Sequence, residues 1–248
     1  MGTIAENIAV VRGRMEQAAA RAGRSAEDVT LVCVTKTRTP FEIAEAIAAG
    51  EYQLGENRVQ EFLEKYEKVQ DIAQGSAKKP NIMWNFIGQL QRNKVKYLAG
   101  KTSLIHSIDS FKLAVEVDAR AYRAGEKAQV LIQMNMAGEE QKSGVAVPEC
   151  EALLNEIEEK LSFVKVRGLM AVVPDVEDPE DVRGYFRDAK RMFDMLAKKR
   201  GETAGEFVHL SMGMTHDFEV AIEEGATIVR VGTAIFGPRN SDYQSVLK

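Results

Sequence analysis

Apolar residues in this chain recur at two different spacings, one typical of helices and one typical of strands. Steps of three or four residues from Ile4 to Met15 predict a helix over residues 2–22, and Gly23 ends it. Beyond that glycine, short β-branched and apolar runs alternate with longer amphipathic stretches, beginning with the run at residues 29–34. The pattern therefore predicts one leading helix followed by a series of strand–helix units.

Eight short apolar runs are predicted to be strands, and the stretches between them to be helices. The strands are expected at residues 29–34, 52–54, 82–87, 104–108, 128–134, 164–173, 206–210 and 227–231. The helices are expected at residues 41–49, 59–73, 93–99, 110–124, 148–161, 182–199 and 218–224. Residues 234–236 continue beyond a turn after the last strand, so each strand but the last is followed by a helix.

A series of strand–helix units favours a parallel sheet, because right-handed crossovers place successive strands side by side. Eight units in 248 residues match the size of a (β/α)8 TIM barrel, here with an extra N-terminal helix. A doubly wound open sheet is the structural alternative, but no strand is followed by a G-x-G-x-x-G turn. No linker or internal repeat divides the chain, so residues 1–248 are expected to form a single domain. In a barrel, functional groups gather at the carboxyl ends of the strands.

A lysine follows directly on the first apolar run. Strand alternation puts Val32, Val34 and Lys36 on one face, so Lys36 points into the barrel mouth if the valines point inward. One interpretation is a lysine at a strand end that extends its ammonium group to water. The other is a desolvated lysine with a lowered pKa, able to form a Schiff base with a carbonyl compound.

The turns after the last two strands each combine a glycine with a hydroxyl residue, Ser211 with Gly213 and Gly232 with Thr233. Barrels commonly hold phosphate at these two loops. Glycines let a phosphate approach backbone N–H groups, and hydroxyls add donors, so two ordinary turns are the weaker interpretation. Arg230 lies within the last strand, where a buried arginine needs a partner or a ligand.

Two further segments carry polar residues near strand ends. Asn57 follows the second strand and could cap the helix that begins near Val59, line a site, or do both. The loop that includes Gly138–Gly144 follows the fifth strand and has the length of loops that cover active sites. A mobile surface loop explains its composition equally well.

Composition narrows the classes of function. With 33 basic and 37 acidic residues the formal net charge is −4, and no basic stripe is present, so nucleic acid is not an expected partner. No run of 18 uncharged apolar residues exists, so no membrane span is expected. Cys33 and Cys150 lie in apolar or helical patterns and indicate reduced thiols of a cytoplasmic protein. His106, His209 and His216 form no metal-ligand spacing, so no metal site is expected.

Seven stretches along nearly the whole chain resemble, in order, the pyridoxal 5′-phosphate (PLP) homeostasis protein family. They are VTKT around Lys36, GENRVQE at 55–61, WNFIGQLQRNK at 84–94, GEEQKSG at 138–144, RGLM at 167–170, LSMGM at 210–214 and FEVAIEEGATIVRVGTAIFG at 218–237. The resemblance implies a fold type III PLP barrel, similar to the barrel domain of alanine racemase.

The resemblance also implies a role for each candidate residue. Lys36 would carry PLP as a Schiff base, Asn57 would lie near the ring, and Arg230 would face the pyridine nitrogen. The phosphate would be held by Ser211, Met212, Gly213, Gly232 and Thr233. The chain departs from the family where Asn85 replaces the usual histidine and Arg38 replaces the usual lysine.

These implied roles predict a protein of intracellular PLP homeostasis that stores, buffers or delivers PLP without catalysis, with no catalytic residue. A guanidinium beside the pyridine nitrogen disfavours protonation of the ring and makes it a poor electron sink. The alternative is a PLP-dependent amino-acid racemase or weak transaminase, whose second acid/base group is not evident after any strand end. A PLP-free phosphosugar enzyme that uses Lys36 is a third hypothesis, against which Arg230 counts. Expected partners are PLP and PLP-requiring apo-enzymes, and the chain is expected to be a monomer.

Overall fold

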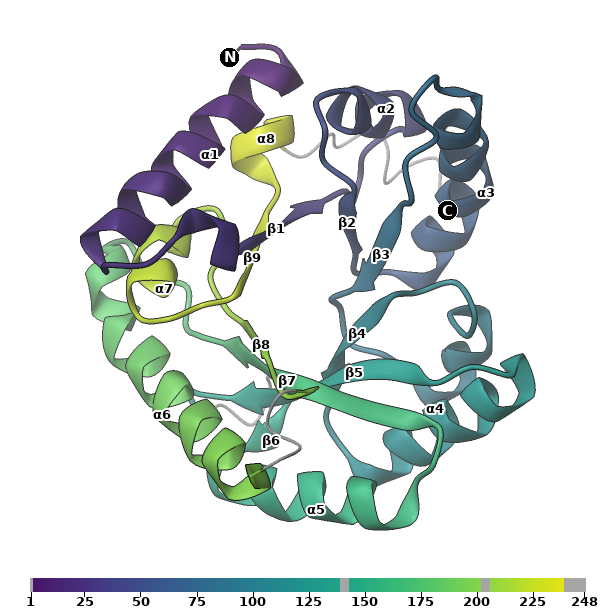
Figure 1. Cartoon of the computed structure of the whole chain (residues 1–248), viewed down its shortest axis with the longest axis vertical. Helices are drawn as coiled ribbons and strands as arrows, with labels where there is room; N and C mark the ends of the chain where they lie inside the picture. Colours follow the sequence, from purple (N-terminus) through teal and green to yellow (C-terminus); the bar gives the residue numbers. More distant parts are fainter. Residues whose placement is uncertain (1, 139–142, 202–205, 239–248) are drawn as a thin grey trace.

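The computed structural model describes residues 2–138, 143–201 and 206–238. Within them, one parallel nine-stranded sheet has the order β4-β3-β2-β1-β9-β8-β7-β5-β6. A further pairing of β4 with β5 closes all strands except β6 into an eight-stranded barrel (Figure 1). The barrel strands are Thr30–Val34 (β1), Gln53–Glu56 (β2), Met83–Phe86 (β3), Leu104–Ile108 (β4), Ala128–Asn135 (β5), Val164–Val172 (β7), His209–Ser211 (β8) and Ile228–Val231 (β9); the short β6 is Val145–Ala146.

Helices surround the barrel on its outer face (Figure 1). The α-helices are Ile4–Arg21 (α1), Pro40–Ala48 (α2), Val59–Gly75 (α3), Phe111–Ala124 (α4), Cys150–Lys160 (α5), Arg183–Arg200 (α6), Phe218–Glu223 (α7) and Thr233–Phe236 (α8). Short 3₁₀ turns add Ala26–Asp28 (η1), Arg92–Tyr97 (η2), Val147–Glu149 (η3) and Pro179–Val182 (η4). The leading helix α1 packs beside α8, where the amide Nδ2 of Asn7 donates to the Ile235 carbonyl at 2.8 Å.

Side-chain alternation along β1 separates two layers of the core. Leu31 and Cys33 belong to the large cluster between the sheet and the surrounding helices. Val32 points the other way, into a smaller cluster formed with Leu104, Leu131, Met170 and Ile228. Because these side chains fill the barrel interior, the residues that continue the Val32 face at the end of β1 lie above a closed floor.

The predicted fold class, a (β/α)8 TIM barrel with an extra N-terminal helix, is confirmed. Two local predictions are wrong. The helix expected at residues 93–99 is instead the 3₁₀ turn η2, closed by bonds between residues three apart, such as Lys94 N–H to the Gln91 carbonyl at 2.9 Å. The segment 234–236 belongs to helix α8, so the last barrel strand is also followed by a helix.

No helix in the described parts of the chain combines the length and the apolar character needed to cross a membrane.

Candidate functional site

A cavity of about 330 Å³ opens at the carboxyl ends of the barrel strands. This volume lies within the range of small-molecule sites, and its place in the barrel is where such sites occur. Residues from the ends of β1, β2, β3, β7, β8 and β9 line it, among them Lys36, Asn57, Gly88, Thr215, Arg230 and Thr233.

Lys36 lies on the cavity wall at the end of β1, on the same face as Val34, as strand alternation predicts. The residue between them, Thr35, is fully buried. A lysine side chain therefore enters the barrel mouth while its neighbour is directed into the protein. The amine is the one nucleophilic group among the cavity-lining residues that forms a Schiff base with an aldehyde.

Asn57 lines the cavity instead of capping the helix that follows it. The N-cap position of α3 belongs to Arg58, whose side chain makes no capping hydrogen bond. The Oδ1 atom of Asn57 is buried and has no hydrogen-bond partner among the described residues. The chain just beyond β3 can lie against Asn57 because residue 88 is a glycine. A Cβ at residue 88 would lie 2.1 Å from the Asn57 carbonyl oxygen. A buried amide oxygen without a partner is costly, and a ligand with a donor group would satisfy it.

Arg230 brings a positive charge to the floor of the cavity. Its Nη1 donates to the Ser211 hydroxyl at 2.7 Å, and its Nη2 donates to the Ala171 carbonyl at 3.2 Å. Burial lowers the pKa of Arg230 to about 10, while the Asp217 carboxylate acts in the opposite direction. With a pKa of about 10 the guanidinium remains charged at neutral pH, and both of its hydrogen-bond acceptors are neutral. This residue can therefore hold an electron-rich atom of a ligand.

A chain of hydrogen bonds continues from Arg230 across the barrel. Asn85 Nδ2 donates to the carbonyls of Leu54 and Met83 at 3.3 and 3.2 Å, which orients the amide and turns its Oδ1 toward His106. His106 Nε2, 3.1 Å from that oxygen, must then be the donor, so Nδ1 accepts from the Ser211 hydroxyl at 3.0 Å. Burial, followed by the charge of Arg230, holds the pKa of His106 well below its usual value, which agrees with a neutral ring.

The turns after β8 and β9 meet at the cavity rim. The Gly232 N–H donates to Thr215 Oγ1 at 3.3 Å, and Gly232, Thr233 and Thr215 all line the cavity. The predicted phosphate residues Ser211, Met212 and Gly213 are buried and are not among the lining residues. Gly213, with φ +90°, packs so closely on α7 that a Cβ would lie 2.6 Å from the Cβ of Ala221. The turn thus directs residues 214–217 toward the cavity and leaves residues 211–213 behind them.

Sequence reasoning assigned no role in the site to several of its residues, among them Thr215, Asp217 and His106. Thr215 and Asp217 lie just beyond the glycine turn and line the cavity; Asp217 Oδ1 accepts the Met214 N–H at 2.5 Å. Burial raises the pKa of this carboxyl group. Alternation along the fourth strand provided a signal for His106, because it shares a face with the inward-pointing Leu104.

Part of the predicted loop over the site, residues 139–142, lies outside the described residues. At its end, Gln133 Nε2 donates to the Ser143 carbonyl at 2.7 Å. Across the residues that the structure describes, no group of three or more His, Cys, Asp or Glu side chains could hold a metal ion.

Comparison with known proteins places this geometry in context. The family model described as alanine racemase, N-terminal domain, matches residues 3–240. A pyridoxal phosphate homeostasis protein of Aquifex aeolicus is 47% identical over 234 residues, which cover 94% of this chain and 97% of that protein. A crystal structure of an unknown protein from Bifidobacterium adolescentis has a TM-score of 0.87 and 36% identity, with 94% of each chain covered. PipY of Synechococcus elongatus PCC7942, solved with PLP bound, has a TM-score of 0.77 and 31% identity, with 94% of this chain and 100% of that chain covered.

Proposed function

Because the chain belongs to the pyridoxal phosphate homeostasis protein family, we propose that it binds PLP in the cavity at the barrel mouth and takes part in PLP homeostasis. One observation carries the proposal: a lysine and a buried arginine line the same cavity of about 330 Å³. The lysine amine can form a Schiff base with the aldehyde of PLP, and the arginine can donate a hydrogen bond to the pyridine nitrogen. The solved structure of PipY with PLP bound supports this choice of ligand.

The residues present fit PLP group by group. Lys36 would form the Schiff base, and the unpartnered amide oxygen of Asn57 would accept from a donor on the ring. Gly232 and Thr233 would hold the phosphate at the start of α8, with Thr215 beside them. Ser211, Met212 and Gly213 would support the site from beneath the lining residues, and Ser211 would do so by accepting a hydrogen bond from Arg230. In this arrangement the whole chain serves as one PLP-binding domain.

We further propose that the protein carries PLP without using it in catalysis. Bound PLP supplies an aldehyde for amines and a ring that withdraws electrons from an attached amino acid. The charged Arg230 would disfavour a proton on the ring nitrogen and so weaken that withdrawal. A racemase also needs a second acid/base group, and no tyrosine is found among the described residues that line the cavity. His216 and Asp175 do line it, so the catalytic alternative deserves a direct test.

Retention of PLP through gel filtration tests the binding proposal. Wild type should retain the cofactor, while Lys36→Ala should lose the covalent link and retain at least about tenfold less. Lys96→Ala removes a lysine of η2 instead and should behave as wild type. Equal retention by Lys36→Ala and wild type would contradict the role of Lys36.

Exchange of α-protons separates a carrier from an enzyme. The PLP-loaded protein is incubated with L-amino acids in D₂O and the α-proton signals are followed by NMR, with free PLP and Lys36→Ala as controls. A carrier should give no exchange above free PLP. Exchange well above free PLP that is lost in Lys36→Ala would establish an enzyme.

We propose that this protein is a cytoplasmic monomer that delivers PLP to apo-enzymes. The buried free thiols of Cys33 and Cys150 support a reducing compartment. Transfer is tested by adding the PLP-loaded protein to a PLP-requiring apo-enzyme with a PLP scavenger present; recovery of activity would support delivery, and no recovery would contradict it.

A further inference from the structure

A fully buried cluster of charges lies beneath the turn that bears Lys36. Its centre is the Lys65 ammonium of α3, with Nζ 2.8 Å from Glu56 Oε1 and 3.1 Å from Glu61 Oε2. All three side chains are at most 1% exposed. None of the three is among the residues that line the cavity.

This cluster holds the residues on both sides of Lys36. Lys65 Nζ donates to the Thr35 carbonyl at 2.8 Å, and the Thr35 hydroxyl donates to Glu56 Oε1 at 2.6 Å. On the other side, the Thr37 N–H donates to Glu61 Oε2 at 2.7 Å. The backbone on both sides of Lys36 is therefore held by Lys65 and Glu61 of α3, while Glu56 of β2 holds the Thr35 side chain.

The held turn is one that the sequence by itself disfavours. Its closing bond runs from the Arg38 N–H to the Thr35 carbonyl at 3.0 Å, so Lys36 and Thr37 are the two central residues. Thr37 has φ +61°, a left-handed conformation that glycine normally supplies at this turn position and that a β-branched residue rarely adopts. Such a conformation persists only where surrounding contacts impose it, and the Thr37 N–H contact with Glu61 does so here.

A contribution to stability does not explain this cluster well, because three apolar side chains of similar volume would often be as stable as a buried ion pair. The position of the cluster against the residues that flank Lys36 explains it better. We propose that Lys65, together with Glu61 and Glu56, is a positioning device that holds Lys36 in the orientation needed to bond with PLP. This inference rests on the proposed function, since it assumes that Lys36 is the residue that bonds with PLP.

The step that depends on this orientation is a balanced condensation. The neutral amine of Lys36 would attack the aldehyde carbon of PLP, and a carbon–nitrogen double bond would replace the carbon–oxygen double bond. The aldehyde oxygen would leave as water with the two protons of the amine, and nothing is oxidised or reduced. Because the amine must approach the carbonyl carbon along a narrow range of directions, a displacement of the Lys36 backbone slows the step.

Schiff-base formation by two variants tests the device. Lys65→Met removes the ammonium at similar length, and Glu61→Gln keeps the shape while weakening the link to Lys65. Each apo-protein is mixed with PLP, and the rate of Schiff-base formation is followed by its visible absorption. The adduct is then reduced with borohydride and located by mass spectrometry. We expect Lys65→Met to form the adduct at Lys36 at least about tenfold more slowly, and Glu61→Gln to be slowed less.

Two controls separate positioning from loss of stability. Arg12→Met also removes a cation paired with a glutamate of the β2 region, Glu51, but at the opposite end of that strand. It should form the adduct at the wild-type rate. Thr37→Gly added to Glu61→Gln should restore part of the lost rate, because glycine adopts a positive φ without strain. General destabilisation would not respond in this way. If Lys65→Met does not fold, the Glu61→Gln series tests the proposal by itself.

Folded variants that form the Lys36 adduct at the wild-type rate would overturn the positioning role and leave the proposed function intact. A wild-type protein that forms no adduct at Lys36 would overturn the proposed function, and this inference with it.

Discussion

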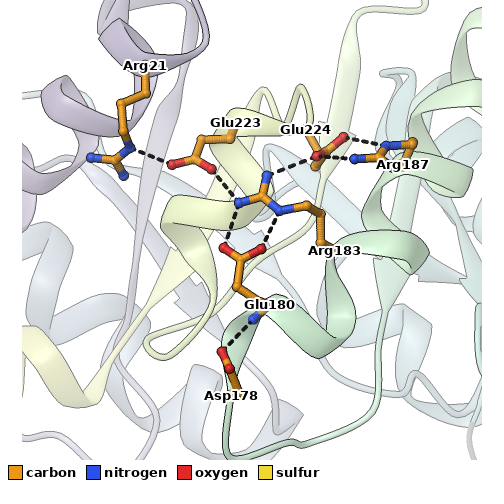
Figure 2. Close-up of polar contacts among 7 residues, drawn as sticks. All are labelled: Arg21, Asp178, Glu180, Arg183, Arg187, Glu223 and Glu224. Carbon is orange, nitrogen blue, oxygen red and sulfur yellow. Dashed lines mark hydrogen bonds and ion pairs between the residues drawn. The ribbon is translucent and has the colours of Figure 1, made fainter.

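Two clusters in this barrel both pair basic side chains with glutamates, but one lies at the surface and the other is fully buried. At the surface, Arg183 of α6 contacts Glu180, Glu223 and Glu224 at 2.6, 2.6 and 2.9 Å (Figure 2). Through Arg21, which binds Glu223, this surface cluster joins α1, α6 and α7 (Figure 2). Beneath Lys36, the buried cluster of Lys65, Glu56 and Glu61 joins β2 and α3 to the end of β1.

The pKa of Glu56 in the buried cluster is shifted in the opposite direction to the pKa values of Glu180, Glu223 and Glu224 in the surface cluster. Hydrogen bonds from Arg183 lower the pKa of Glu180, and although burial opposes it, arginine contacts also lower the pKa of Glu223 and Glu224. In the buried cluster, burial raises the pKa of Glu56 in spite of the attraction of Lys65. Exposure to water therefore decides whether the charged form of a paired carboxyl group is stabilised. The surface cluster connects helices with little loss of hydration, whereas the buried cluster removes its charged groups from water and fixes the backbone around Lys36.

Removal of the buried cation should have the largest effect on stability. Lys65→Met leaves two buried carboxylates without their partner, which should cost about 3–5 kcal/mol of unfolding free energy. Urea denaturation of the apo-protein measures it. A cost below about 1 kcal/mol, the range of exposed pairs, would remove the distinction between the two clusters.

The buried His106 should make stability depend on pH between 7 and 5, a range in which the surface cluster has little effect. Its folded pKa lies well below the ordinary 6.5, so the unfolded chain binds a proton that the folded chain does not. Stability is therefore fully present above pH 6.5 and falls as pH drops below it, by at most about 2 kcal/mol at pH 5, the limit set by the unfolded pKa. The difference in unfolding free energy between pH 7 and pH 5 should be smaller in His106→Gln, by no more than that limit. The same pH dependence in both proteins would show that a group other than His106 binds the proton on unfolding.

The surface cluster should show the smallest effect and the strongest response to salt. Arg183→Met should cost roughly 1 kcal/mol, because its contacts are partly solvated. In 1 M salt, where screening acts within about 3 Å, the cost should shrink, while that of Lys65→Met should not. The lowered pKa values mean that this contribution is present above pH 4.5 and is lost as pH falls below it. A salt-independent cost would show that Arg183 acts through packing.

Periodicity predicted the barrel because each strand and helix carries its own apolar pattern. It failed where an element is too short to show a period, as in α8, which has four residues. It also failed at η2, where the pattern of residues 93–99 is helical but the hydrogen bonds join residues three apart. Helix type at such short segments depends on how the chain must reach the next strand, which periodicity does not report.

The site was predicted unevenly for a similar reason. Alternation from Val32 placed Lys36 at the cavity, and a charged residue inside a strand marked Arg230. No local pattern indicates that Arg58, and not Asn57, is the N-cap of α3, or that Gly88 lies against the Asn57 carbonyl. Nor does any pattern show that Lys65, which lies at an ordinary helical position, contacts the Thr35 carbonyl 30 residues earlier in the chain. This contact forms only when β1, β2 and α3 pack together, which no pattern along the chain reports.

The most direct test of this account is to find which atom holds the cofactor. The wild-type protein is loaded with PLP, reduced with borohydride, digested and mapped by mass spectrometry, with Lys36→Ala treated in parallel. The account predicts a pyridoxyl group on Lys36 at near-stoichiometric yield and none at the corresponding peptide of the variant. A pyridoxyl group on another lysine with Lys36 unmodified, or no adduct at all, would contradict it.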